Sequence, residues 1–366
     1  MKILHIINVR WWNACAYYAA ILAKIQQDKQ ENVYIIVNKN SKAIPEIKKL
    51  NVPFYDNINL DTDNPFMLFI ESLKLAKLIK KHKIDIVNAH RGEGFLFIRL
   101  AIWLSGNKCY LIRTRGDQRF PSKNIFSKIQ NKYLTDGHIV TTKKLENYYL
   151  KTNLCKPDKI ITIYGGTEDI KPYKKKPASL HNSNKVIIGI LGRLYKVKGH
   201  QYLIESAKYL KDKGIDNFQI LIAGTGEERK NLENLVQRYN LSDKIKFLGF
   251  VEDRNAFLHS LDIAVISSIG SEMICRVGFE YMCAGLPIVA TKVNSIAEIM
   301  QDNYNAILVK PNDSEQLTKA LSKLISSKEL RNRMGKHSRK IFLTYYQVMN
   351  FYQSTKNFYE AIRQKF

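Results

Sequence analysis

The sequence predicts an α/β protein built from two doubly wound, Rossmann-like domains. Three observations predict it. The chain has 366 residues, too many for one ordinary core, and 45% of them are hydrophobic. Short apolar runs rich in β-branched residues alternate with helical segments along the whole chain. A polar stretch at 168–184, with prolines and several lysines, separates two such series and is typical of a linker.

The predicted first domain covers 1–167, with strands at 2–9, 33–38, 84–90, 109–115, 138–142 and 161–166. The second covers 185–346, with strands at 185–192, 218–224, 245–250, 262–268, 287–291 and 306–310. Helical segments such as 198–213 and 313–325 alternate with them, so each set of strands should form a parallel sheet covered on both faces. Residues 347–366 predict a last helix, whose apolar stripe has to be buried on one of the two domains.

Charge and composition restrict the partners and the compartment. The net charge is +25, which favours nucleic acid, phosphorylated ligands or an anionic membrane, although a general bias toward lysine would also produce it. No apolar run approaches the roughly 20 residues of a membrane span, and the N-terminus looks like a first strand rather than a signal peptide. Five scattered cysteines indicate neither a disulfide framework nor a metal site. We therefore expect a cytoplasmic protein.

Open parallel sheets bind ligands at the carboxyl ends of their strands, which directs attention to the loops there. In the second domain, Gly192, Arg193 and Lys198 follow the first strand and precede a helix, a combination that suits a diphosphate. Gly224 and Gly226 follow the next strand, but Gly-x-Gly is too short for a dinucleotide fingerprint. Ordinary solvated turns remain the alternative for both loops.

We expect a helix from Ile274 to Cys283. Glu272 lies just before this helix, and Glu280 lies two turns into it. A carboxylate accepts two neighbouring hydroxyl donors, as sugars present them, whereas the amides at the helix start over 274–278 suit phosphate oxygens. Each acid alone is explained as well by the helix dipole or by a salt bridge.

The first domain places aromatic and basic residues at its strand ends. Trp11 and Asn13 follow the first strand, His90 and Arg91 follow the strand at 84–90, and a basic group surrounds the end of 109–115, namely Arg113, Arg115, Asp117 and Arg119. The arginines suit a phosphate on an acceptor, and one tryptophan suits stacking on a sugar. A structural histidine and arginines paired with nearby acids are the alternatives.

The segment DTDNP at 61–65 predicts a helix N-cap with proline in the first turn rather than a metal site. The helix that follows is apolar at its start and lysine-rich toward its end. This distribution suits an anionic membrane surface, although an ordinary surface helix is equally compatible with it.

Taken together, the phosphate-type loop GRLYKVKGH (192–200), the Gly-x-Gly turn and the spacing Glu272-x7-Glu280 resemble the family 4 glycosyltransferases, as does YGGTEDI at 164–170. The resemblance covers nearly the whole chain and implies the GT-B fold, with an interdomain cleft and a C-terminal helix that crosses back to the first domain. The family often has Gly-Phe-Gly where this chain has Met273, Ile274 and Cys275.

The resemblance also implies roles for single residues. Glu272 would bind the donor sugar and, with His90, act in catalysis. The donor-binding set would be Gly192, Arg193, Lys198, Gly224, Gly226, Glu227, Val251, Ile274, Cys275 and Glu280, with Glu280 on the ribose. The acceptor-binding set would be Trp11, Asn13, Arg91, Arg113, Arg115, Asp117 and Arg119.

The expected function is transfer of a sugar, with retention, from a nucleotide-diphosphate sugar to a hydroxyl of a glycan or lipid-linked acceptor. It implies a place in cell-envelope polysaccharide or lipopolysaccharide synthesis, peripheral contact with the inner face of the cytoplasmic membrane, and no nucleic-acid partner. We expect no metal or other cofactor. The alternatives are a sugar-nucleotide epimerase of the same fold and a non-catalytic basic protein that binds polyanions or membranes.

Overall fold

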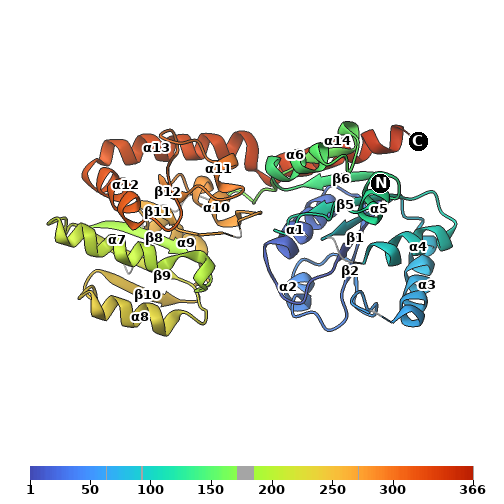
Figure 1. Cartoon of the computed structure of the whole chain (residues 1–366), viewed down its shortest axis with the longest axis horizontal. Helices are drawn as coiled ribbons and strands as arrows, with labels where there is room; N and C mark the ends of the chain where they lie inside the picture. Colours follow the sequence, from blue (N-terminus) through green and yellow to red (C-terminus); the bar gives the residue numbers. More distant parts are fainter. Residues whose placement is uncertain (63, 92–93, 171–184, 271, 366) are drawn as a thin grey trace. The chain divides into compact units, whose positions relative to one another are not determined.

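The computed structural model describes residues 1–62, 64–91, 94–170, 185–270 and 272–365, which form two compact α/β units (Figure 1). The first unit contains Met1–Gly166 and Val348–Phe366, and the second contains Thr167–Gln347. Most of the predicted linker, residues 171–184, lies outside the described part of the chain. Each unit is described separately below.

The first unit contains a seven-stranded parallel sheet in the order β3-β2-β1-β4-β5-β6-β7. Its strands are β1 (Lys2–Ile7), β2 (Asn32–Val37), β3 (Phe54–Tyr55), β4 (Ile86–His90), β5 (Tyr110–Arg115), β6 (Gly137–Val140) and β7 (Ile160–Thr162). Strands β4 and β6 are buried along their whole length, and β1 is buried after its first residue, which explains why the sequence shows largely continuous apolar runs there.

Seven α-helices belong to the described part of the first unit: α1 (Ala14–Asp28), α2 (Ile44–Lys48), α3 (Pro65–His82), α4 (Phe95–Ser105), α5 (Ile125–Lys132), α6 (Lys143–Lys151) and α14 (Val348–Gln364). The start of α3 follows from its sequence, because Asn64 accepts hydrogen bonds from the amides of Phe66 and Met67 and Pro65 occupies the first turn. The DTDNP segment therefore caps a helix, as predicted.

Helix α14 packs back onto the first unit although it is the last element of the chain. Its apolar stripe is buried against α1, where the rings of Tyr18 and Phe351 lie 4.5 Å apart. The Tyr359 hydroxyl accepts a hydrogen bond of 2.6 Å from Asn88 in strand β4. Of the two positions that the stripe allowed, the helix takes the one on the first unit.

The second unit contains a six-stranded parallel sheet in the order β10-β9-β8-β11-β12-β13. Its strands are β8 (Val186–Leu191), β9 (Phe218–Ala223), β10 (Ile245–Gly249), β11 (Ile263–Ile266), β12 (Ile288–Thr291) and β13 (Ala306–Val309). Its helices are α7 (His200–Asp212), α8 (Arg229–Arg238), α9 (Arg254–Ser260), α10 (Arg276–Cys283), α11 (Ile296–Ile299), α12 (Ser314–Ser326) and α13 (Lys328–Ile341).

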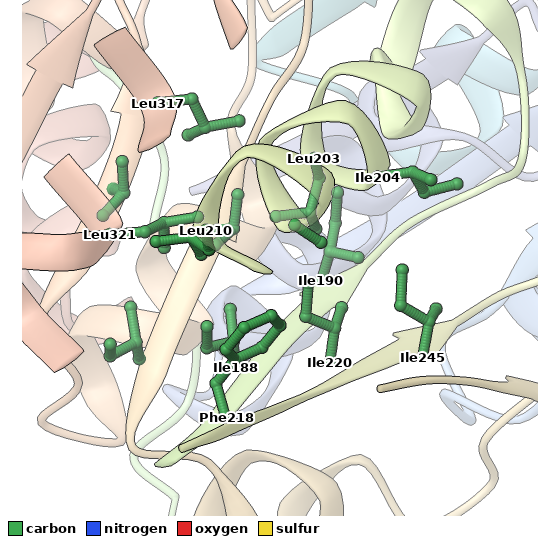
Figure 2. Close-up of a cluster of buried hydrophobic side chains, with 14 of the residues drawn as sticks. Ile188, Ile190, Leu203, Ile204, Leu210, Phe218, Ile220, Ile245, Leu317 and Leu321 are labelled. Atoms are coloured by element: carbon green, nitrogen blue, oxygen red, sulfur yellow. The ribbon is translucent and has the colours of Figure 1, made fainter. Parts of the chain in front are cut away.

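The core of the second unit lies between this sheet and the helices that cover it (Figure 2). Ile188 and Ile190 of β8 lie below Leu203 of α7, and Leu321 of α12 packs beside them. All four side chains are almost completely buried, and each such burial contributes about 1.5–3 kcal/mol before entropy is counted. This packing fixes the strand ends that form the site described below.

The predicted fold class is confirmed, with small differences at element boundaries. Helix α10 begins at Arg276 rather than at Ile274, because Cys275 forms its N-cap and accepts the amide of Gly278 at 3.0 Å. Strand β3 was missed because it has only two residues. None of the helices in the described ranges combines the length and apolar character that crossing a bilayer requires.

Candidate active site

Three strand ends of the second unit are joined by backbone hydrogen bonds. Gly192 donates to the Ala223 carbonyl at 2.9 Å, and Gly224 donates to the Gly249 carbonyl at 2.7 Å. Gly224 has a φ of +143°, and a Cβ atom there would overlap the Gly192 carbonyl oxygen. Glycine at position 224 is therefore required for these two loops to lie against each other.

A hollow of about 230 Å³ opens at the carboxyl ends of β8 and β11 in the second unit. It combines polar and apolar lining residues, namely Ile190, Leu191, Gly192, Lys198, His200, Val265, Ile266, Ser267, Ser268, Glu272 and Val277. Of the residues predicted to bind a donor, the structure brings Gly192, Lys198 and Glu272 together here.

Glu272 is held in this hollow at both its side chain and its backbone. Its Oε1 atom accepts from Lys198 Nζ and, at 2.6 Å, from Ser268 Oγ. Its carbonyl oxygen accepts from both the amide and the hydroxyl of Ser295, at 2.9 and 2.6 Å. The carboxylate is only 3% exposed, so these contacts fix it in place.

Glu280 is held in a similar way on helix α10. Its Oε1 atom lies 2.9 Å from Arg254 Nη1 and 2.9 Å from Arg276 Nε. Its Oε2 atom is buried and has no hydrogen-bond partner among the described residues. A buried carboxylate oxygen without a donor is costly, which makes this atom a strong candidate to bind a ligand hydroxyl.

In both glutamates Oε1 thus binds protein cations, and in Glu280 the buried Oε2 remains available. Hydroxyl groups are donors that a carboxylate oxygen can accept, and sugars and ribose carry such groups in pairs. Lys198, between Glu272 and the glycine-rich loop, supplies a positive charge for an anionic leaving group. This arrangement can hold a molecule that carries both hydroxyls and phosphates.

His200, the first residue of α7, also lines the hollow and was not among the predicted site residues. It is buried, and neither ring nitrogen has a hydrogen-bond partner among the described residues. Burial, together with the nearby Lys198 charge, lowers the pKa of His200 to about 4, so the ring is neutral at pH 7. In the sequence, only its position directly after Lys198 and Gly199 indicated that His200 could belong to the site.

The other predicted donor residues lie near the hollow without lining it. Arg193 is exposed, and its guanidinium lies 4.9 Å from the centre of the Tyr195 ring. Ile274 and Cys275 are buried, and burial raises the pKa of the Cys275 thiol, which excludes it as a ready nucleophile. Two further predicted residues are exposed or half-buried, Glu227 and Val251, and Gly226 packs against the Leu194 backbone.

In the first unit, His90 ends strand β4 but its ring is buried. Its Nε2 atom lies 2.9 Å from Nδ1 of His5 on the neighbouring strand β1, and His5 Nε2 lies 2.7 Å from Oε1 of Gln26 on α1. Burial lowers the pKa of both histidines, to about 4 for His5, so both rings are neutral. His90 is therefore oriented by a buried chain of polar groups that the sequence did not reveal.

Arg91, immediately after His90, adopts an unusual backbone conformation. Its φ of +88° is in the left-handed region, which a residue with a side chain rarely adopts. Its amide donates to the Thr114 carbonyl at 2.9 Å, and its Nη1 donates to the Asn8 carbonyl at 3.2 Å. These bonds hold the strained backbone at the strand end, where such strain is typical of functional sites.

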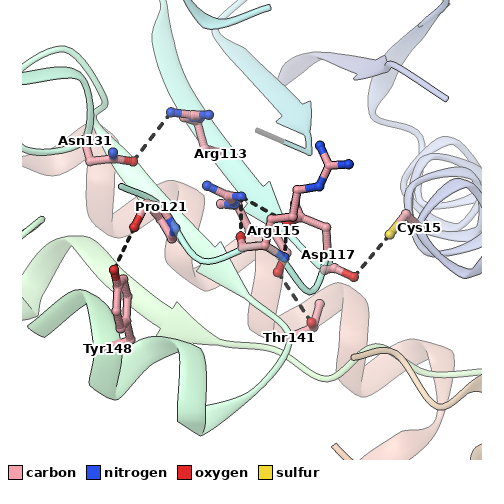
Figure 3. A network of polar contacts seen from close by, with 10 residues as sticks. Cys15, Arg113, Arg115, Asp117, Pro121, Asn131, Thr141 and Tyr148 are labelled. Atoms are coloured by element: carbon pink, nitrogen blue, oxygen red, sulfur yellow. Dashed lines mark hydrogen bonds and ion pairs between the residues drawn. The ribbon is translucent and has the colours of Figure 1, made fainter. Parts of the chain in front are cut away.

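The loop after strand β5 is organised by Arg115 and Asp117 (Figure 3). Arg115 Nη2 lies 3.0 Å from Asp117 Oδ1 and also donates to the Arg119 carbonyl at 2.7 Å. Cys15 on α1 donates to the Gly116 carbonyl at 3.3 Å, which ties the loop to the neighbouring helix. The loop thus presents the exposed Arg119 side chain at the carboxyl edge of the sheet.

Two predicted acceptor residues have structural roles instead. Arg113 is buried, with its guanidinium 5.0 Å from the centre of the Phe95 ring and 3.5 Å from Asn131 Oδ1, because its position in β5 directs it under α4 and α5. Asn13 is the N-cap of α1 and accepts the Ala16 amide at 3.0 Å. Trp11, in contrast, is exposed beside it and remains available to a ligand.

No group of three or more potential metal-ligating side chains occurs among His, Cys, Asp and Glu in the described ranges. Positive charge near the hollow is supplied by Lys198, and Val277, near the start of α10, borders the hollow.

Comparison with known proteins shows which proteins the chain resembles. Residues 173–341 match the family described as Glycosyl transferases group 1. An uncharacterized glycosyltransferase of Haemophilus influenzae is 29% identical over 302 residues, covering 79% of this chain and 83% of that protein. The UDP-Gal:alpha-D-GlcNAc-diphosphoundecaprenol alpha-1,3-galactosyltransferase of Escherichia coli is 25% identical over 305 residues, 78% of each chain.

The solved structures agree on the fold. A glycosyltransferase from Rickettsia africae superposes with a TM-score of 0.88 at 20% identity, covering 100% of this chain and 99% of that one. Its two Rossmann-like units are those of the GT-B fold, which this chain shares. The chain therefore has the GT-B fold of these glycosyltransferases, and its residues 173–341 match the family of group 1 glycosyl transferases.

Proposed function

We propose that the chain is a glycosyltransferase that takes a sugar from a nucleotide-diphosphate sugar and transfers it, with retention, to a hydroxyl of a glycan or lipid-linked acceptor in cell-envelope synthesis. The observation that carries the proposal is that Glu272 and Glu280 are both anchored through Oε1 to protein cations, and that the buried Oε2 of Glu280 has no partner among the described residues. In this assignment Glu272 binds the transferred sugar and Glu280 binds the ribose.

The reaction breaks the bond between the anomeric carbon and the diphosphate oxygen and forms a bond from that carbon to the acceptor oxygen. The leaving diphosphate takes the electron pair of the broken bond and gains negative charge, and one of its oxygens accepts the proton of the acceptor hydroxyl. Lys198, Arg193 and the first amides of α10 stabilise that charge, in the place where other enzymes use a metal ion. Retention requires the acceptor to attack from the face that the diphosphate leaves.

The relatives suggest where to begin. The Escherichia coli galactosyltransferase takes its sugar from UDP-Gal, and its name gives an acceptor carried on diphosphoundecaprenol. UDP-sugars and polyprenyl-diphosphate glycans are therefore the first donors and acceptors to test, with lipopolysaccharide core as the next acceptor. The Arg115–Asp117 loop, which presents Arg119, is the proposed contact for an acceptor phosphate.

A panel of nucleotide diphosphates and nucleotide sugars, screened by thermal shift, tests the donor. A ligand bound only by the folded protein raises the melting temperature, and we expect one nucleotide base to give the largest shift. Transfer to acceptor, followed by NMR of the product linkage, then tests retention. An inverted linkage would contradict the stereochemistry, and conversion of the sugar nucleotide without any acceptor would indicate an epimerase.

A further inference from the structure

Three helices of the first unit cover the same face of its sheet. Helices α3 and α4 pack against each other along their length (Figure 1). Arg113 on strand β5 contacts Phe95 of α4 and Asn131 of α5, so α4 and α5 lie on the same side of that strand. Each of the three helices follows a strand of one parallel sheet, so their first turns lie at the same carboxyl edge.

The first turns of these helices expose large apolar side chains. Phe66 is 71% exposed, Leu96 is 60% exposed and Phe126 is 73% exposed. Phe69, Leu73 and Ile125 extend the exposed surface, and the six residues together are called the apolar patch here. Single exposed apolar residues are ordinary, but six on three neighbouring helices, five of them in the first two turns, mark an interaction surface.

The helices that carry the apolar patch are also strongly basic. Their only acid, Glu71, is buried and paired with Lys74 at 2.8 Å. The basic residues are Lys74, Lys77, Lys80, Lys81, Arg99, Lys128 and Lys132, and the four lysines of α3 are exposed. Along α3 the exposed residues change from Phe66, Phe69 and Leu73 to lysines toward the C-terminus. The three helices therefore expose apolar and cationic side chains and no acidic one.

We propose that this surface docks the protein on an anionic phospholipid bilayer. The apolar patch would enter the boundary between headgroups and acyl chains, and the lysines of α3 would lie over anionic headgroups. The Arg115–Asp117 loop lies at the same edge of the sheet, so docking would bring it to the membrane surface, where a lipid-linked acceptor resides. That last consequence rests on the proposed function, whereas the docking itself does not.

Co-sedimentation of the full chain with phosphatidylcholine vesicles, with and without phosphatidylglycerol, tests the proposal. We expect binding only when phosphatidylglycerol is present and weaker binding as salt is raised. The double variant Phe66→Ser/Phe126→Ser should lower the partition coefficient by about tenfold or more, since each ring loses its apolar burial. Lys77→Gln/Lys81→Gln should lower it by about fivefold per lysine.

The matched controls are on the second unit. Lys319→Gln/Lys323→Gln removes two exposed lysines from α12, and Leu343→Ser removes an exposed apolar residue, and neither should change vesicle binding. Circular dichroism and melting temperature verify that each variant is folded. No sugar donor enters the assay, so the result does not depend on whether the proposed transfer reaction is correct.

Three results would overturn the proposal. The wild-type chain could remain unbound, phosphatidylcholine alone could bind it equally well, or the controls could lose as much binding as the patch variants. Sedimentation velocity adds a fourth. A wild-type dimer that Phe66→Ser/Phe126→Ser dissociates, without any vesicle binding, would assign the apolar patch to self-association.

Discussion

His5 Nδ1 lies 2.9 Å from His90 Nε2, and the other ring nitrogen of His5 lies 2.7 Å from the amide oxygen of Gln26. The Gln26 oxygen can only accept, so His5 carries its proton on Nε2 and accepts at Nδ1. His90 must then donate from Nε2, which leaves its Nδ1 unprotonated. The buried chain therefore sets His90 as a hydrogen-bond acceptor at the end of strand β4.

Replacing Gln26 tests this relationship. Gln26→Leu removes the acceptor, so the His90 proton should no longer be fixed on Nε2, and the ¹⁵N shifts of its ring should move toward a tautomer mixture. If His90 contacts the donor sugar, kcat should fall about tenfold with little change in KM. Gln27→Leu, at the neighbouring and less buried position, is the control. Unchanged His90 shifts in Gln26→Leu would contradict the chain as described.

Three buried histidines predict how stability depends on pH. Burial lowers the pKa of His5 and His200 to about 4 and that of His138 to about 3, whereas an unfolded histidine titrates near 6.5. The unfolded chain therefore binds more protons as pH falls from about 6.5, and stability should be fully present above that pH. Below that pH, the free energy of unfolding should fall by on the order of 1 kcal/mol for each histidine and each pH unit.

Urea unfolding at several pH values between about 7 and 5 measures how steeply the free energy of unfolding falls with pH. This interval extends from just above the pKa of an unfolded histidine toward the lowered pKa values of His5 and His138. His138→Gln should remove one histidine's share of it. A free energy of unfolding that is independent of pH across this interval would show that these rings are protonated in the folded protein.

The glycine contacts in the second unit distinguish structural from ligand-binding roles. Gly224→Ala should destabilise the unit by at least about 2 kcal/mol, because the new Cβ overlaps the Gly192 carbonyl and φ is positive. Gly192→Ala meets no atom within 4 Å and should leave the melting temperature nearly unchanged. If Gly192 allows the diphosphate to approach the backbone, Gly192→Ala should still weaken donor binding. Equal stability of the two variants would contradict the packing.

The arginines on Glu280 should matter for nucleotide affinity. Arg254→Gln or Arg276→Gln removes one of the two cations that hold Oε1, so Oε2 should be less well positioned for the ribose. We expect nucleotide affinity, measured by isothermal titration calorimetry, to fall about tenfold. Arg238→Gln, an exposed arginine on α8, is the control. Wild-type affinity in both Glu280-arginine variants would separate Glu280 from the ribose.

Most of the fold could be predicted because its signals are local. Buried parallel strands such as β1 and β8 are continuous apolar runs. The start of α3 is marked by Asn64 and Pro65, and the whole capping signal lies within residues 64–67. Strand β3 and the start of α10 could not be predicted as well. A two-residue strand has no periodicity, and the Cys275 cap has no hydrogen-bonding side chain that marks a helix start.

The site was predictable only in part, since its supporting contacts are between residues distant in the chain. Glu272, Glu280 and Lys198 were found from their spacing and strand-end positions. Ser295, which holds the Glu272 backbone, and Arg254, which holds Glu280, lie 23 and 26 residues away from their partners and belong to no local motif. The burial of Arg113 could not be predicted, because side-chain direction in β5 depends on which face α4 and α5 cover.

The most direct test of the central claim is transfer by Glu272→Gln, with the affinity for the donor nucleotide measured on the same sample. The variant keeps the size of the side chain and removes the charge that Lys198 and Ser268 hold in the hollow. We predict that transfer falls by at least about a hundredfold while nucleotide affinity stays close to that of the wild type. Wild-type turnover in this variant would show that the hollow around Glu272 is not where the sugar reacts.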